Sequence, residues 1–312
     1  MKILFLINKQ TYLTKLCRAR FIGFDILKKN DKITMKYWGN GWDNYNSNLT
    51  VQQNLDNIQD KFDICVVYKP LEFKNFKDIN LLKVIQYNEM YDVNWTLKEI
   101  KESGSQLVIC HHLNDCKKYQ KMNISDVKFV YIGHCAPKTI FKNYNVKKDY
   151  DILIAGAISH LYPLRYKLLQ LIPFLKKKYK CHIHPHPGYD LQDAHTDRYL
   201  KEMAESINKS RLILTCSSIF KYRLGKYIEI PMCGSSAICG DLPDDNVDDY
   251  SYVIEVNNNM TDMEIINKIS YYLDNEDKRL EKVDKGVKFA QNYTQEHYAE
   301  RLLKEINDFL IK

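Results

Sequence analysis

The sequence predicts an α/β protein built from two doubly wound domains with parallel sheets. A short apolar strand opens each half of the chain, at residues 2–7 and 150–155, and a helical pattern follows each of them. Apolar runs then alternate with amphipathic segments along both halves, which is the pattern of consecutive βαβ units. At 312 residues the chain is also longer than an average single domain.

The boundary between the two domains is expected near residues 143–149, which are polar and show no periodicity. We therefore predict a first domain over 1–145, a second over 146–291, and a terminal helical segment over 292–312. Thr294 is the expected N-cap of that last helix, whose apolar stripe includes Tyr298, Leu302 and Ile306.

Polar groups follow three consecutive strands of the first half, predicted at 83–87, 106–110 and 127–132. Glu89 and Asp92 follow the first of these strands, His112 and Asp115 the second, and His134 the third. Ligands of open α/β sheets bind beyond the carboxyl ends of the strands, and carboxylates or imidazoles at that edge are suited to general acid–base catalysis. Solvated loops are the alternative. For a catalytic base we favour Glu89 or Asp92, then His112 or Asp115.

Metal and dinucleotide sites are not expected. The spacing of Cys110, His111, His112 and Cys116 fits no common structural zinc site. No G-x-G-x-x-G follows the first strand, so a dinucleotide cofactor is not predicted.

Composition indicates a globular protein that is kept in a reducing, cytosol-like compartment. Its nine cysteines include no C-x-x-C pair, and no run approaches the length of a membrane span. The first apolar run is too short for a signal peptide. The formal charge of +7 suits phosphates, a nucleotide or an acidic polymer, but it is too dispersed to indicate nucleic acid.

Residues 211–243 are the most informative stretch, because they predict a strand, a helix over 222–232, a stop at Gly234 and a second strand. Arg223, Lys226 and Glu229 recur every three residues and are expected on one face of that helix. Cations near a helix N-terminus suit a phosphorylated ligand, and a carboxylate can accept from ribose hydroxyls. A solvated face with an i,i+3 ion pair is the alternative.

The run KYIEIPMCGSSAI (226–238), followed by GDLP (240–243), resembles the nucleotide-sugar motif of GT-B glycosyltransferases. The family pattern is approximately K-[LYF]-x-E-x-x-[AM]-x-G-x-[PS]-[VA]-[IV]. The similarity is to the group-1 and the CgeB-like, spore-protein glycosyltransferase-like members. It implies that Glu229 holds the ribose, that Lys226 and Arg223 meet the diphosphate, and that Gly234 lets backbone approach the ligand. Tyr222 stands where many retaining members have a second acidic residue, so the resemblance leaves the stereochemical course open.

The resemblance extends to the start of the second half. It implies that the small-residue turn with Gly156 and Ser159 faces the diphosphate and that Arg165 reaches a phosphate; a surface arginine is the alternative. His182, His184 and His186 alternate along a predicted strand, and we favour a structural or base-contacting role for them over a metal site. Family members also have a C-terminal helix that crosses back to the first domain.

We therefore expect two Rossmann-like α/β/α domains that face each other across a cleft, as in GT-B proteins. The expected function is metal-independent transfer of a sugar from a nucleoside-diphosphate donor, held by the second domain, without a further cofactor. The acceptor is expected to be a saccharide, a protein or a lipid-linked molecule. Three alternatives stay open: a nucleotide-sugar epimerase, a non-catalytic nucleotide-sugar-binding module, and a transferase acting on DNA bases.

Overall fold

The computed structural model describes all residues except 16–18, 29–30, 190, 192–195, 246–248 and 312. The chain divides into two compact units, each with one parallel sheet. Among the described residues, the first unit comprises those within 1–133 and 298–311, and the second those within 134–191 and 196–297.

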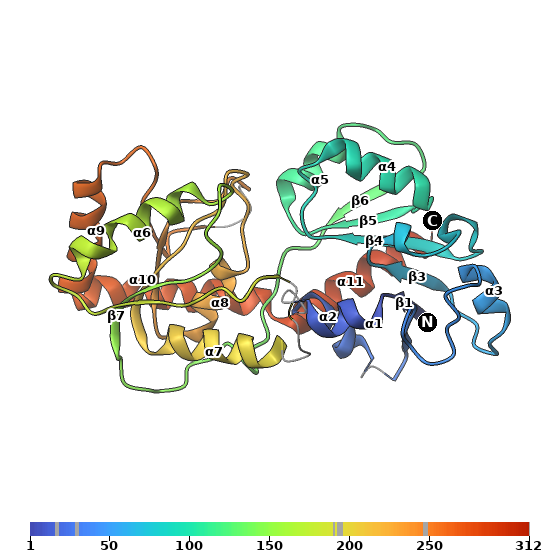
Figure 1. The fold of residues 1–312 in the computed structure, drawn as a ribbon, viewed down its shortest axis with the longest axis horizontal. Helices are drawn as coiled ribbons and strands as arrows, with labels where there is room; N and C mark the ends of the chain where they lie inside the picture. Colours follow the sequence, from blue (N-terminus) through green and yellow to red (C-terminus); the bar gives the residue numbers. More distant parts are fainter. Residues whose placement is uncertain (16–18, 29–30, 190, 192–195, 246–248, 312) are drawn as a thin grey trace. The chain divides into compact units, whose positions relative to one another are not determined.

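The first unit contains a six-stranded sheet in the order β2-β1-β3-β4-β5-β6, in which every neighbouring pair is parallel (Figure 1). Its strands are β1 (Lys2–Leu6), β2 (Thr34–Trp38), β3 (Ile64–Val67), β4 (Leu82–Tyr87), β5 (Leu107–Cys110) and β6 (Lys128–Tyr131). Its helices are α1 (Lys9–Thr14), α2 (Ala19–Leu27), α3 (Val51–Asp56), α4 (Val93–Ser103) and α5 (Leu113–Gln120), with the short turns η2 (Pro70–Glu72) and η3 (Phe76–Asp78).

The second unit contains a five-stranded parallel sheet in the order β11-β10-β9-β7-β8. Its strands are β7 (Tyr150–Ile154), β8 (Cys181–Ile183), β9 (Ser210–Leu214), β10 (Ala237–Gly240) and β11 (Val253–Glu255). Its helices are α6 (Pro163–Leu175), α7 (Thr196–Asn208), α8 (Lys226–Cys233), α9 (Asp262–Asp274) and α10 (Glu276–Ala290), followed by the short turn η4 (Gln291–Tyr293).

Helices cover both faces of each sheet. In the second unit α6 and α9 pack on one face, and α7 and α8 pack on the other (Figure 1). In the first unit α4 and α5 lie on the side of the sheet opposite α11 (Gln295–Leu310). These layers confirm the predicted fold of two Rossmann-like α/β/α domains. Both faces of the strands are buried, which is why the strands read as continuous apolar runs in the sequence.

The chain passes from the first unit to the second at Gly133–His134, earlier than the polar stretch suggests. Ala136, Ile140 and Phe141 pack in the core of the second unit, so the segment before the polar stretch already belongs there. At the other end, α11 belongs to the first unit from Tyr298 onward. The Tyr298 hydroxyl accepts from Gln86 on β4 at 2.6 Å, and Lys128 on β6 pairs with Glu305 at 3.1 Å.

One predicted helix begins at a different residue, and one helix of the structure was not predicted. Helix α8 begins at Lys226 and not at residue 222, so Arg223 precedes the helix and does not share a face with Lys226 and Glu229. Helix α5 was not expected, because most of its residues are polar and only Asp115, Cys116 and Tyr119 are buried. Among the described residues, no helix has both the length and the apolar character needed to cross a membrane.

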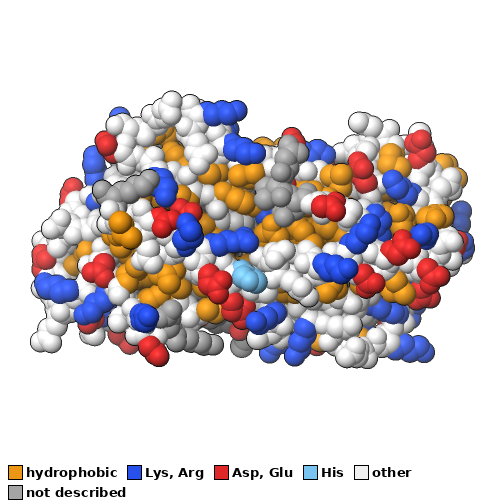
Figure 2. Space-filling model, turned by 180° about the vertical axis from the view of Figure 1, so that it is seen from behind, with side chains coloured by type: hydrophobic (Ala, Val, Ile, Leu, Met, Phe, Trp, Pro, Cys, Tyr) orange, Lys and Arg blue, Asp and Glu red, His pale blue; other side chains and the backbone are white. Residues whose placement is uncertain are grey.

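Surface charge is mixed. On the face drawn in Figure 2, basic side chains are interspersed with acidic and hydrophobic ones. The formal charge of +7 is therefore dispersed on this face, as the sequence predicts.

We expect Phe141→Ala to destabilise the second unit selectively, by about 3–5 kcal/mol, because it leaves a cavity in that unit's core. Hydrogen exchange resolved by peptide would show faster exchange in β7, β9 and β10 and unchanged exchange in β1, β3 and β4. Phe174→Ala, at an exposed position on α6, is the matched control. Faster exchange of the first unit in Phe141→Ala would contradict the division of the chain given above.

Candidate functional site

The five-stranded sheet has its topological switch point between β7 and β9. In the order β11-β10-β9-β7-β8, the chain leaves β7 toward β8 at one end of the sheet, and it leaves β9 toward β10 in the opposite direction. Ligands of doubly wound sheets bind at the carboxyl edge beside such a point. Gly156 follows β7 there and Thr215 follows β9, and Gly156 has a φ of +109° that favours glycine.

Arg165, in the first turn of α6, joins these two strand ends. Its guanidinium donates to the Ala157 carbonyl at 2.5 Å and to the Thr215 hydroxyl at 3.3 Å, and it stacks on the Tyr162 ring at 4.5 Å. A Cβ on Gly156 would lie 2.8 Å from the guanidinium carbon. Arg165 is therefore a buried cation beneath the Gly156 turn, 2% exposed, and not the surface arginine of the alternative interpretation.

Two helix N-termini meet this edge. Helix α6 begins after Tyr162 and helix α8 after Gly225, and neither N-cap side chain accepts a hydrogen bond from its helix. The first N–H groups of both helices thus lack a side-chain cap. Such groups, together with the positive end of the helix dipole, attract anions. Ser159 lies exposed in the turn between β7 and α6, where its hydroxyl accepts from the Leu161 amide at 3.3 Å.

Lys226 and Glu229 form an ion pair at the start of α8. Both side chains are partly buried, with 19% and 14% of their surfaces exposed. This pair is the i,i+3 contact of the alternative interpretation, and it also places a cation and a carboxylate at the carboxyl edge of the sheet. Whether the two groups hold a donor stays a prediction.

Two imidazoles face the same cations. His184 and His186 follow β8, and the His184 Nδ1 lies 2.9 Å from the Ser206 hydroxyl. Burial, and after it the charge of Lys226, lower the pKa of His184 to about 4. Burial, Lys226 and Arg165 lower the pKa of His186 to about 4. The three histidines do not share one strand face, because β8 ends at Ile183.

Two further predicted donor residues have other contacts or positions. Arg223 is buried and engaged, 3.7 Å from the Asp245 carboxylate and 4.2 Å from the centre of the Tyr293 ring. Gly234 ends α8 in a left-handed conformation, and β10 starts shortly after it, so it lies at the amino edge of the sheet. Helix α8 carries Gly234 to the edge opposite Lys226 and Gly156, so its approach to the same ligand stays a prediction.

Asp241, which directly follows β10, lies in the GDLP run (240–243), but the sequence analysis gave it no role. It is buried and accepts from the Ser217 amide and hydroxyl, both at 2.7 Å, and from Lys221 at 2.6 Å. These bonds fix the loop after β9 at the carboxyl edge. Its position directly after a buried strand was the available signal.

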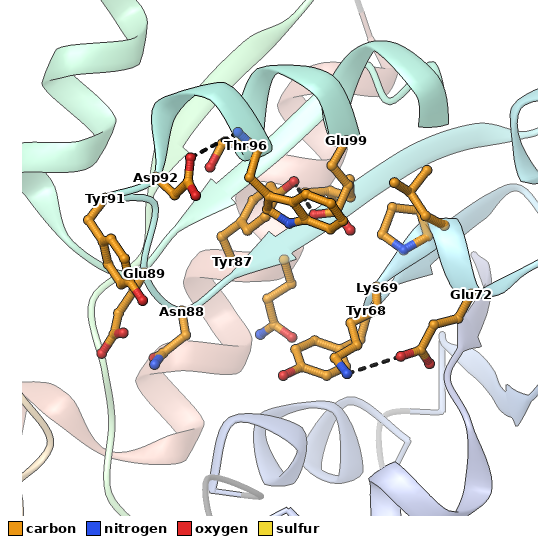
Figure 3. Close-up of a pocket in the computed structure, with 15 residues that line it drawn as sticks. Tyr68, Lys69, Glu72, Tyr87, Asn88, Glu89, Tyr91, Asp92, Thr96 and Glu99 are labelled. Carbon is orange, nitrogen blue, oxygen red and sulfur yellow. Dashed lines mark hydrogen bonds and ion pairs between the residues drawn. The ribbon is translucent and has the colours of Figure 1, made fainter. Parts of the chain in front are cut away.

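The first unit has a cavity of about 580 Å³ at the carboxyl ends of β3 and β4 (Figure 3). Of the predicted base candidates, Glu89 and Asp92 line it. Asp92 also caps α4, since its carboxylate accepts from the Trp95 amide at 3.0 Å. Further polar and aromatic lining residues were missed by sequence reasoning, because the segment after strand β3, strand β4 and helix α4 supply them together: Tyr68, Glu72, Gln86, Tyr87, Trp95 and Glu99.

Glu99 stands out among the lining carboxylates. It is buried on α4 and accepts a hydrogen bond from the Tyr87 hydroxyl. Burial raises the pKa of Glu99, although the Tyr87 hydrogen bond opposes this shift. No pattern in the sequence indicated this burial, because a glutamate in the middle of an amphipathic helix is normally solvated.

His112 and Asp115 do not line this cavity. Both are buried, and the Asp115 carboxylate accepts from the Met90 amide at 2.9 Å. The strand ends of β4 and β5 therefore meet as expected, but Asp115 connects the two loops instead of facing the cavity. His134 belongs to the second unit. Across the part of the chain that the structure describes, no three His, Cys, Asp or Glu side chains are arranged to hold a metal ion.

We expect the two lowered pKa values to make folding stability depend on pH. An unfolded histidine titrates near 6.5, so between pH 6.5 and about 4 the unfolded chain binds more protons at these positions than the folded chain. Their contribution is fully present above pH 6.5 and is lost as the pH falls toward 4. Urea midpoints at pH 7 and pH 4.5 should therefore differ more in the wild type than in His184→Gln/His186→Gln. His160→Gln, at an exposed position, should keep the wild-type difference; equal differences in the wild type and the double variant would contradict the expectation.

No protein-family model matches the chain, and no curated protein matches its sequence. Solved structures match it over nearly its whole length. Sucrose-phosphate synthase from Thermosynechococcus elongatus has a TM-score of 0.66 at 9% identity, covering 100% of this chain and 99% of that one. HepE of Anabaena, in complex with UDP and glucose, has a TM-score of 0.64 at 11% identity, covering 99% and 100%.

An alpha-glucosyltransferase in complex with UDP and a 13-mer DNA has a TM-score of 0.63 at 11% identity, covering 100% of both chains. Identities this low establish the fold and nothing finer. Together with the two parallel sheets and the helices on both faces of each, they show that the chain has the fold of the GT-B glycosyltransferases.

Proposed function

We propose that this protein is a glycosyltransferase that moves a sugar from a nucleoside-diphosphate donor to an acceptor hydroxyl. The observation that carries the proposal is the carboxyl edge of the second unit's sheet. Two helix N-termini without side-chain caps, the buried cation of Arg165 and the cation of Lys226 lie at the switch point there. This combination suits a diphosphate bound through backbone N–H groups and nearby positive charge.

The remaining parts of a donor site are also present at this edge. In the proposed complex, Glu229 accepts from the ribose hydroxyls, and His184 and His186 lie beside the base. Because the pKa values of both imidazoles are lowered to about 4, they are neutral at pH 7 and can accept as well as donate. The absence of a side chain at Gly156 lets the Arg165 guanidinium pack directly beneath this turn.

The comparisons support the choice of donor. The HepE structure contains UDP and glucose, and the alpha-glucosyltransferase structure contains UDP, so two proteins with this fold bind a uridine nucleotide. We extend this property to the present chain as a proposal, with the nucleotide and the sugar left to experiment.

The reaction needs no metal and no further cofactor in this proposal. The acceptor oxygen attacks the anomeric carbon, the bond from that carbon to the phosphate oxygen breaks, and the nucleoside diphosphate leaves with the electron pair. Lys226, Arg165 and the helix N-termini stabilise the charge that develops on the leaving group. If the reaction inverts, Glu89 or Asp92 of the first unit takes the acceptor proton.

A saccharide, protein or lipid-linked acceptor and a cytosolic location complete the proposal. The location rests on the cysteines. The eight that the structure describes form no disulfide with one another, and thiols suit reducing surroundings. An epimerase would act on the donor without an acceptor, and a binding module would hold the donor without turnover.

We expect one class of nucleoside diphosphate to raise the stability of the protein, by about 2.7 kcal/mol when present at 100 times its dissociation constant. Thermal unfolding with UDP, GDP, ADP, CDP and dTDP, and with their sugar conjugates, measures this effect. Lys226→Ala should weaken binding about tenfold or more, because a charge-assisted contact contributes about 1.5–3 kcal/mol.

Lys278→Ala is the matched control, because Lys278 forms the same i,i+3 pair with Glu281 on an exposed helix of the same unit. It should leave nucleotide binding unchanged. Stabilisation by none of the nucleotides, or equal loss in both variants, would refute the donor site.

A further inference from the structure

The cavity of the first unit presents exposed aromatic surface. Trp95 is 51% exposed and Tyr91 is 45% exposed, and both line the cavity with Tyr68 and Tyr87. Figure 3 labels Tyr68, Tyr87 and Tyr91 in this cavity, with the carboxylates of Glu89, Asp92 and Glu99 among them. Side chains of this size are usually covered in a protein without a ligand, so their exposure around one hollow points to a ligand with apolar faces.

The charges that line the cavity are unsuited to an anion. Four carboxylates line it, whereas Lys69 is the one cation among its described lining residues and is paired with Glu72 at 3.0 Å. A phosphorylated ligand or a nucleic acid would meet repulsion from these carboxylates. Carboxylates and amides are instead good acceptors for hydroxyl donors.

From the aromatic faces and the acidic lining together, we infer that this cavity binds an uncharged saccharide. The sugar stacks its C–H face on Trp95 or Tyr91 and donates hydroxyls to Glu89 and Glu99. That the saccharide is the acceptor rests on the proposed function, whereas the binding itself does not. The inference selects one of the three acceptor classes and excludes DNA as the molecule bound in this cavity.

Calorimetry on the full chain without nucleotide tests the inference with three probe sets. The first contains uncharged trisaccharides (maltotriose, cellotriose, chitotriose, mannotriose), the second glucose 6-phosphate and glucuronic acid, and the third a single-stranded 13-mer DNA. We expect at least one uncharged trisaccharide to bind and Trp95→Ala to weaken that binding about tenfold. Tyr271→Ala, an equally exposed aromatic of the second unit, should leave it unchanged.

The salt dependence separates the probe sets further. Binding of an uncharged saccharide should be the same at 50 and 300 mM salt, whereas binding of DNA falls steeply with salt. The inference is overturned if no trisaccharide binds at millimolar concentration, or if the anionic sugars or DNA bind in a way that Trp95→Ala removes. Stabilisation by nucleotides is measured separately. If no saccharide binds, the proposed donor site is unaffected. If a saccharide binds but no nucleotide stabilises the protein, the donor site is refuted and the saccharide inference is supported.

Discussion

The uniform direction of the strands is the constraint on which both candidate sites depend. When every strand of a sheet is parallel, each helix must return the chain, so strand carboxyl ends and helix N-termini meet at one edge. That edge collects Gly156, Thr215 and Lys226 from segments far apart in the sequence. The same constraint sends Gly234 to the other edge, whatever motif it belongs to. A motif read along the sequence can therefore span a sheet from one edge to the other.

Rigidity at the second unit's edge comes from buried charge. Arg165 is held by a carbonyl, a hydroxyl and an aromatic face, and Asp241 is held by an amide, a hydroxyl and a lysine. Buried charges are costly unless several groups satisfy them, and the groups that do so become fixed in turn. The loops after β7 and β9 are thus fixed before any ligand arrives, which is the preorganisation that electrostatic stabilisation of a leaving group requires.

The sequence predicted the strands well and the sites only in part, for physical reasons that differ between residues. The strands were predictable because both of their faces are buried, which leaves an uninterrupted apolar run. The start of α8 was misplaced because Arg223 is held by Asp245 and Tyr293, contacts that local periodicity cannot show. Gln86 and Glu99 were missed because one side chain sits within a strand and the other within a helix, and only the packing of α4 beside β4 brings both to one cavity.

The two candidate sites have opposite electrostatic character, and the ligands proposed for them follow from this difference. The edge of the second unit combines Arg165 and Lys226 with two helix N-termini, whereas the cavity of the first unit is lined by carboxylates. A diphosphate is attracted to the first of these and repelled by the second, so a donor and an uncharged acceptor would not compete for one site. A carboxylate beside the acceptor would also favour removal of its hydroxyl proton, because the attacking oxygen gains positive charge as its bond to the anomeric carbon forms, and the carboxylate can accept the proton. The acidic lining would then contribute to catalysis as well as to the choice of acceptor.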